Sequence, residues 1–88
     1  MSARAQAWAM RQVAGSPVDK LVLMLIADSA YDGGWAPAAE FTAPEGPIPD
    51  MAEMSSDEVW MSVLRLEARG LLRLGEGFIK LDLDRPQG

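Results

Sequence analysis

The stretch that decides the fold runs from Ser55 to Leu83 and reads SSDEVWMSVLRLEARGLLRLGEGFIKLDL. Its first part predicts a helix from Ser56 to Arg69, because apolar residues recur at helical spacing after a serine that can act as the N-cap. Gly70 then ends the helix as a C′ residue. Two short strands, LLRL and FIKLDL, follow on either side of Gly75-Glu76-Gly77, and the second alternates apolar and polar residues as a half-buried strand does. The sequence therefore predicts a helix that leads directly into a β-hairpin.

Two further helices are predicted before this segment. Residues 3 to 13 (ARAQAWAMRQV) are mostly good helix formers. After them, Ser16 has the features of an N-cap, with Pro17 at the first helical position and Asp19 three residues after the cap. The second helix is expected to run from Pro17 to about Tyr31 and to be mostly buried. Its apolar residues at helical spacing are Val18, Leu21, Val22, Leu25 and Ile26.

The segment from Trp35 to Met54 gives the weakest pattern. Pro37 fits the start of a short helix through Phe41, and the stretch from Asp50 to Met54 fits one further helical turn. Residues 43 to 49 (APEGPIP) are predicted to be non-helical, because each proline removes a donor and restricts the residue before it. We therefore expect a single domain over residues 1–88, with a proline-rich irregular insert at about 43–50.

Composition narrows the class of protein. With 49% hydrophobic and 24% charged residues, the chain has the composition of a globular domain. It has no apolar run long enough to span a membrane and no apolar segment typical of a signal peptide, so a cytoplasmic location is expected. The absence of cysteine and histidine removes disulfides, thiolate zinc sites and imidazole ligands. We expect no metal and no cofactor.

The net charge argues against DNA binding, and the residue types present argue against catalysis. Eight basic against thirteen acidic residues give a formal net charge of −5, whereas proteins that bind duplex DNA usually display a basic patch that neutralises phosphates. Catalysis has little support, because the most common base and nucleophile are missing and no serine lies beside a lysine in a recognisable arrangement. The chain is therefore expected not to be an enzyme.

Two stretches of the chain resemble the winged helix-turn-helix domains of phage and plasmid replication and regulatory proteins. The first contains Ala7-Trp8-Ala9, Ser16-Pro17, Lys20-Leu21-Val22-Leu23, Leu25-Ile26-Ala27-Asp28 and Gly34-Trp35-Ala36-Pro37. The second contains Ser55, Val59, Val63-Leu64, Leu66-Glu67 and Arg69-Gly70-Leu71-Leu72. The resemblance implies an α+β, mostly α fold: a winged helix-turn-helix with three or four helices and a C-terminal β-hairpin wing. In such domains the second stretch forms the recognition helix and the start of the wing.

The sequence departs from that family in two places. The proline-rich insert interrupts the second helix and tight turn that should precede Ser55, and these normally seat the recognition helix in a groove of DNA. The second departure is chemical. The positions expected to face bases or phosphates are Ser56, Asp57, Trp60, Met61 and Leu64. None of these residues is basic, whereas readers of base edges commonly use Arg, Lys, Asn or Gln.

Trp60, Met61 and Leu64 form an apolar stripe beside the stripe that the helix is expected to bury. Trp and Met are enriched at the cores of protein interfaces, so one interpretation is a partner-binding surface made by these residues with Asp57 and Glu58. The alternative is that the proline-rich segment folds back over the stripe through Pro47 and Ile48, because monomers seldom leave large apolar patches bare.

Two charged clusters flank this helix, and each has two interpretations. The acidic cluster comprises Asp50, Glu53, Asp57 and Glu58. It would attract a basic partner, or it would stabilise the helix N-terminus. The basic cluster comprises Arg65, Arg69, Arg73, Lys80 and Arg85. It would contact phosphates through the wing, or Arg65 and Arg69 would complete the helix C-terminus while Arg73 and Lys80 form a cross-strand pair.

These observations favour a small, acidic, non-enzymatic binding protein on a winged-helix scaffold, derived from a phage or mobile element. It would act by protein–protein interaction on a basic, nucleic-acid-handling partner, for example as an anti-CRISPR-like inhibitor. Self-association into a homodimer through the same face is the simplest competitor. The alternative function is a direct DNA-binding transcriptional or replication regulator. In that case the DNA-binding residues would be Arg65, Arg69, Arg73 and Lys80.

Overall fold

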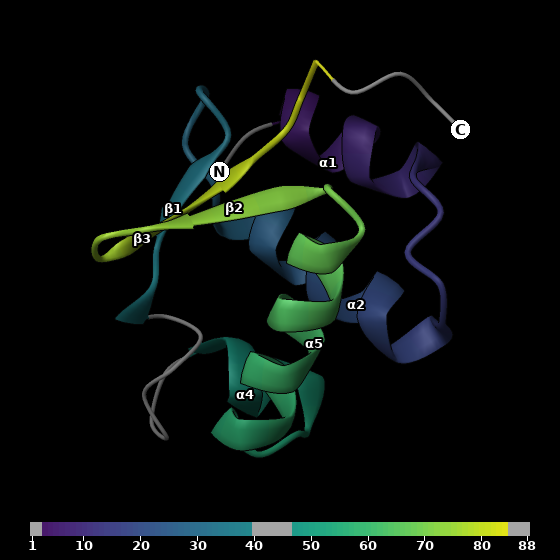
Figure 1. Cartoon of the computed structure of the whole chain (residues 1–88), viewed down its shortest axis with the longest axis vertical. Coiled ribbons are helices and arrows are strands. Elements are labelled where there is room, and N and C mark those ends of the chain that lie inside the picture. The colour runs from purple at the N-terminus through teal and green to yellow at the C-terminus, as the bar shows by residue number, and fades with distance from the viewer. Residues whose placement is uncertain (1–2, 40–46, 85–88) are drawn as a thin grey trace.

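The computed structural model describes residues 3–39 and 47–84 and shows a small α+β fold that is mostly helical. The helices are α1 (Ala3–Arg11), α2 (Pro17–Ser29), α4 (Pro47–Ala52) and α5 (Ser56–Ala68). The strands are β1 (Trp35–Pro37), β2 (Leu72–Gly75) and β3 (Phe78–Leu81). Figure 1 shows α1 and α4 at opposite ends of the longest axis, with α5 leading from α4 up to the sheet. Within the described ranges, no helix is long and apolar enough to cross a membrane.

Helix α2 begins as the sequence predicts. The hydroxyl oxygen of Ser16 accepts a hydrogen bond from the backbone N–H of Asp19 (3.1 Å), and Pro17 lies in the first turn, where its missing N–H costs nothing. The helix ends at Ser29, two residues before the predicted end, because Ala30 adopts an extended backbone with ψ of 146°. Local capping chemistry therefore sets the start of this helix.

Helix α5 also confirms its prediction, to within one residue at its end. A reciprocal capping box closes its N-terminus: the Ser55 hydroxyl oxygen accepts from the Glu58 N–H (3.1 Å), and the Glu58 carboxylate accepts from the Ser55 N–H (3.0 Å). At the other end, Gly70 has φ of 79°, a left-handed conformation that favours glycine. The chain then turns directly into β2.

The predicted hairpin is confirmed, and it belongs to a three-stranded antiparallel sheet in the order β1-β3-β2. Strands β2 and β3 pair with Leu72 opposite Leu81 and Arg73 opposite Lys80. Strand β1 pairs with the other edge of β3. Its position is fixed further by a hydrogen bond from the Leu81 N–H to the Gly34 carbonyl oxygen (2.7 Å). The central strand, β3, is therefore the last strand within the described residues.

The prediction that Pro37 starts a helix is wrong, because Pro37 is the last residue of β1 and lies opposite Phe78. Proline is tolerated in a strand at the edge of a sheet, where its missing N–H removes no essential ladder bond. Strand β1 is such an edge strand. The pairing is with residues more than forty positions later, so no local pattern indicated it. Ala39, inside the predicted helix, is helical, and residues 40 and 41 lie outside the described residues.

The predicted proline-rich irregular insert is wrong in its second half, because α4 begins at Pro47 and contains Pro49. The first turn of a helix has N–H groups without intrahelical partners, so prolines there lose no hydrogen bond. Ile48 is only 1% exposed, and α4 packs against both α2 and α5. Burial of Ile48 therefore supports the helix. Residues 43–46 of the insert lie outside the described residues.

The core lies between the helices and one face of the sheet. Its largest fully buried side chains are Val22, Leu23, Ile26, Ile48, Val59, Val63, Leu66, Leu71, Leu72, Ile79 and Leu81. The pattern predicted for α2 is only half right: Val22 and Ile26 are buried, but Val18 and Leu21 are 46% and 43% exposed. The helix is apolar on most of its circumference, so spacing alone did not show which arc faces the core.

Lys20 joins α1 to α2. Its ammonium group donates hydrogen bonds to the carbonyl oxygens of Ala9 (2.8 Å), Met10 (2.7 Å) and Gln12 (2.6 Å). Ala9 and Met10 lie in the last turn of α1 and Gln12 directly follows it, where carbonyls lack the regular helical donor and carry the negative end of the dipole. The Lys20 ammonium group therefore caps the C-terminal end of α1 and holds this helix against α2.

We expect Lys20→Met to lower the free energy of unfolding by about 1–3 kcal/mol, because the substitution leaves the α1 carbonyls without their charged donor. Urea unfolding followed by circular dichroism measures this change. Arg11→Met is the matched control, since it removes an exposed cation from the same helix end and should change the free energy by less than about 0.5 kcal/mol. Equal effects of the two substitutions would contradict the role assigned to Lys20.

Candidate functional site

The outward face of α5 is the candidate site. The helix turns Val59, Ser62, Val63 and Leu66 into the core, as predicted. By helical geometry, Asp57, Met61 and Leu64 lie on the opposite side. Met61 is 53% exposed, and Leu64 is half-buried. The outward face therefore presents a large flexible apolar side chain at its centre.

Trp60 does not lie fully on this face. It is half-buried and packs against the hydrophobic core. It is therefore neither fully exposed, as the partner-binding interpretation expects, nor fully covered, as the alternative expects. Ile48 of α4 is buried nearby in the fold, on the helix that packs against α5. Of the predicted stripe Trp60, Met61 and Leu64, Met61 is the residue that a partner can reach most freely.

A hollow of about 310 Å³ lies beside Met61. Its lining residues are Val18, Met54, Asp57, Glu58, Met61 and Arg65. Val18 comes from the first turn of α2, and Met54 from the link between α4 and α5. Sequence reasoning missed both residues as site candidates. Val18 was assigned to the buried arc of α2, and Met54 carried no signal beyond being a methionine beside a helix cap.

Acidic side chains lie in this hollow and next to it. Asp57 and Glu58 line it directly, while Asp50 and Glu53 line a neighbouring depression that shares Met54. The hydrogen bond from the Ser55 N–H lowers the pKa of Glu58, so its carboxylate is charged and fixed in place by the capping box. The structure therefore brings the four predicted acidic residues together around the α4–α5 link.

Arg65, the basic residue of the hollow, is paired with Asp19 of α2. Its Nε and Nη2 atoms donate to the two carboxylate oxygens at 3.0 and 2.8 Å, and the Ser62 hydroxyl donates to the same carboxylate at 2.6 Å. Asp19 is 4% exposed. The Arg65 hydrogen bonds are the main cause of a lowered Asp19 pKa, with Ser62 adding to them and burial opposing them. The charged Arg65 guanidinium is therefore held in an ion pair with a buried acid, while its side chain stays 51% exposed.

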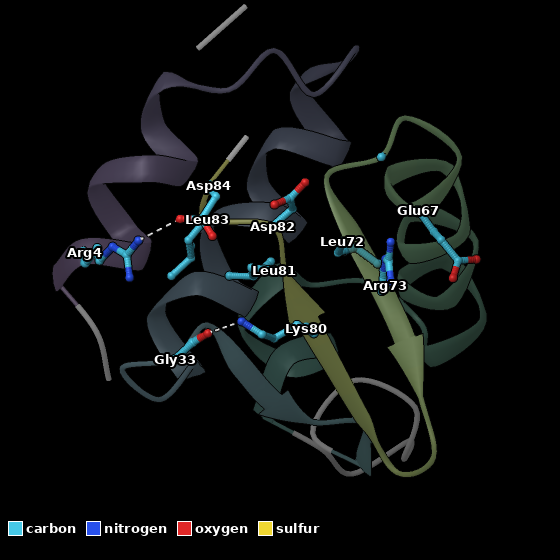
Figure 2. Close-up of a pocket in the computed structure, with 11 residues that line it drawn as sticks. Arg4, Gly33, Glu67, Leu72, Arg73, Lys80, Leu81, Asp82, Leu83 and Asp84 are labelled. Carbon is cyan, nitrogen blue, oxygen red and sulfur yellow. Dashed lines mark hydrogen bonds and ion pairs between the residues drawn. The ribbon is translucent and has the colours of Figure 1, made fainter. Parts of the chain in front are cut away.

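The other predicted DNA contacts lie elsewhere. The Arg69 guanidinium packs against the backbone of Gly15, which has φ of 102°. Arg73 and Lys80 are cross-strand neighbours, as predicted, on the exposed face of the sheet. Lys80 also donates a hydrogen bond to the Gly33 carbonyl oxygen (Figure 2). The four residues thus fall into two groups, Arg65 and Arg69 at the C-terminal end of α5 and Arg73 and Lys80 on the sheet.

A larger hollow of about 490 Å³ lies beside the second pair (Figure 2). Its charged lining residues are Arg4, Glu67, Arg73, Lys80, Asp82 and Asp84. Positive and negative groups are balanced there, and two of the acids are already engaged. Asp84 pairs with Arg4 at 3.4 Å, and Glu67 accepts a hydrogen bond from the Leu74 N–H at 3.2 Å. Such a lining does not provide the uniformly basic surface that duplex DNA requires.

Comparison with known proteins identified no relative of this chain. No protein-family model matches the chain, and searches of curated proteins and of solved structures found no match either. Among the residues that the structure describes, no three acidic side chains gather as a metal-binding group would. The function must therefore be inferred from the surfaces themselves.

Asp19→Asn tests the buried ion pair. We expect it to lower the free energy of unfolding at pH 7 by about 1–3 kcal/mol, because a buried charged acceptor is lost. The folded-state pKa of Asp19 is lowered, so its stabilisation is present above the unfolded-state value of about 3.9 and is lost as pH falls through the folded-state value. The gap between wild type and variant should therefore shrink below about pH 4.

Urea unfolding at a series of pH values measures this dependence. Asp32→Asn is the control, because Asp32 is an exposed carboxylate near the end of α2. A gap between wild type and Asp19→Asn that stays constant from neutral pH into acid would contradict the role of the charged carboxylate.

Proposed function

We propose that this protein is a small, non-enzymatic binding module with a winged-helix fold, and that it recognises a protein partner through the outward face of α5. The element order α2, β1, α4, α5, β2, β3 supports the fold. The link from α4 to α5, Glu53 to Ser55, has the length of a helix-turn-helix connection. In this proposal α5 takes the place of the recognition helix and β2–β3 form the wing.

The exposed Met61 is the observation that carries the proposal. It is 53% exposed and lines the same hollow as the apolar residues Val18 and Met54. A DNA-reading helix would present basic or amide side chains at such positions. Arg65 does not restore a DNA-binding surface, since Asp19 already accepts its hydrogen bonds. An apolar centre on this helix therefore favours a protein over DNA as the ligand of α5.

The rim of the hollow defines the chemistry of the partner. Asp57 and Glu58 border Met61, and Asp50 and Glu53 extend the acidic surface past Met54. Such an arrangement suits a partner that inserts an apolar side chain and surrounds it with basic residues. The charges raise the rate of encounter, and the buried contact supplies affinity. Nucleic-acid-handling proteins carry basic surfaces, and an inhibitor of such a host complex is one form this function could take.

Two competing functions make different predictions. Self-association through the same face requires a dimer that dissociates when Met61 is replaced. Direct regulation through duplex DNA requires salt-sensitive binding that depends on Arg65, Arg69, Arg73 and Lys80. The division of those four cations into two pairs, one of them partly neutralised, favours protein recognition over this second function.

Met61→Asp tests the proposal against Met10→Asp. Met10 is 66% exposed on α1, outside the hollow, so both variants introduce the same charge at an exposed methionine. Affinity capture from cells with each variant should recover one specific partner with wild type and with Met10→Asp. Titration with that purified partner should show Met61→Asp weakened by roughly 30-fold or more, the effect of a central interface residue.

Circular dichroism of each variant verifies the fold, and light scattering reports self-association. Unchanged affinity of Met61→Asp for the partner would contradict the proposed site. A wild-type dimer that Met61→Asp dissociates, with no other specific partner recovered, would replace the proposal with self-association.

A further inference from the structure

The exposed face of the sheet is a second surface, separate from the outward face of α5. Because side chains alternate along a strand, residues of β1, β3 and β2 that share this face form cross-strand rows. The register places Trp35, Lys80 and Arg73 in one row and Pro37, Phe78 and Gly75 in the next. The residues between these rows, such as Ala36 and Ile79, point into the core.

Three exposed aromatic side chains gather on this face. Tyr31, Trp35 and Phe78 are 50%, 43% and 39% exposed. The Tyr31 and Trp35 rings stack with centroids 4.4 Å apart and planes at 30°. The Phe78 ring covers Gly75, in the space that a Cβ would fill. Monomers seldom expose a cluster of aromatic rings without a use for it.

The Trp35 and Phe78 rings line a hollow of about 500 Å³ together with Lys80 and the Glu76-Gly77 turn. Lys80 also lines the hollow of about 490 Å³ that contains Arg73. The two hollows therefore meet at Lys80, and together they extend across the sheet from the aromatic rings to Arg73.

The charges on these strands are positive although the chain is acidic. Arg73 and Lys80 lie directly opposite each other, and like charges in that arrangement destabilise a sheet. The structure shows no ion pair for Arg73 among the described residues. Three acids line the hollow beside Arg73 but lie outside the strands: Glu67 and Asp84 are already engaged, and Asp82 directly follows β3. An anionic ligand would relieve the repulsion between the two cations.

We propose that this sheet face binds single-stranded nucleic acid, with bases stacked on Trp35 and Phe78 and phosphates beside Arg73 and Lys80. Rings that stack on any base, interleaved with cations that follow the backbone, are the general basis of single-strand recognition. A duplex keeps its base faces stacked inside, so the rings favour a single strand. An apolar or proline-rich peptide would use the rings but gain nothing from the cations. This proposal does not depend on the protein-binding function of α5.

Fluorescence anisotropy with labelled oligothymidine and oligouridine of about 12 nucleotides tests the proposal, since one binding domain covers about 4–16 nucleotides. Binding is expected at low salt with a dissociation constant of about 1–100 µM, in the range of sequence-independent contacts. Two phosphate contacts predict that log K falls with log salt with a slope of about −1.4. A duplex of the same length should bind more weakly.

Substitutions on the face should change this affinity in both directions. Trp35→Ala and Phe78→Ala should each weaken binding by about 5- to 150-fold, the loss expected for one stacked base. Arg73→Gln combined with Lys80→Gln should remove most of the salt dependence. Glu76→Gln should tighten binding, because it removes an acid from the aromatic hollow, and a gain in affinity cannot result from misfolding. Arg11→Gln, an exposed cation on α1, is the matched control and should change nothing.

Several results would overturn the proposal. These are tighter binding of the duplex than of the single strand, equal losses from Arg11→Gln and from the sheet variants, or no binding of either oligonucleotide at low salt. A wild-type dimer that Trp35→Ala dissociates, without oligonucleotide binding, would show instead that the face joins two copies of the chain.

Discussion

The buried carboxylate of Asp19 is the constraint on which the arrangement of α2 and α5 depends. It is almost inaccessible to solvent, and it accepts hydrogen bonds from Ser62 and Arg65 of α5. A buried charge is costly unless it is paired and hydrogen-bonded, so the two helices are held in one relative position. The same contact neutralises the basic residue nearest the outward face of α5. One interaction therefore fixes the helix and also engages a cation that a DNA-binding surface would need.

The sequence was sufficient wherever the determining contacts are local. Ser16 and Ser55 cap their helices through residues three positions away, and the hairpin follows from a glycine turn between two alternating strands. Long-range contacts were not predictable in this way. Pro37 belongs to a strand because β3 pairs with it, and Pro47 begins a helix because Ile48 is buried in the core. The local pattern predicted a helix start at Pro37 and a break at Pro47, and both predictions were wrong because the tertiary partner decided the outcome.

In the candidate site, too, local features were predictable from the sequence and long-range contacts were not. Helical spacing placed Asp57, Glu58 and Met61 on an accessible face of α5, and the structure agrees. Spacing could not show that Trp60 turns partly inward, or that Val18 from another helix completes the hollow. The roles of Asp19 and Lys20 were also hidden, because their partners lie on other elements. The local sequence around a residue at the start of a helix does not indicate which side chains from other elements will contact it in the folded protein.

The central claim is that a protein partner covers the hollow around Met61. The chain has six methionines, and their methyl groups can be observed separately by NMR in protein labelled with ¹³C-methyl methionine. On titration with the captured partner, the Met61 and Met54 signals should shift or broaden, while those of Met10, exposed on α1, and Met24, packed on the core, should stay unchanged. A partner that leaves the Met61 signal unchanged, or that perturbs Met10 instead, would contradict the claim.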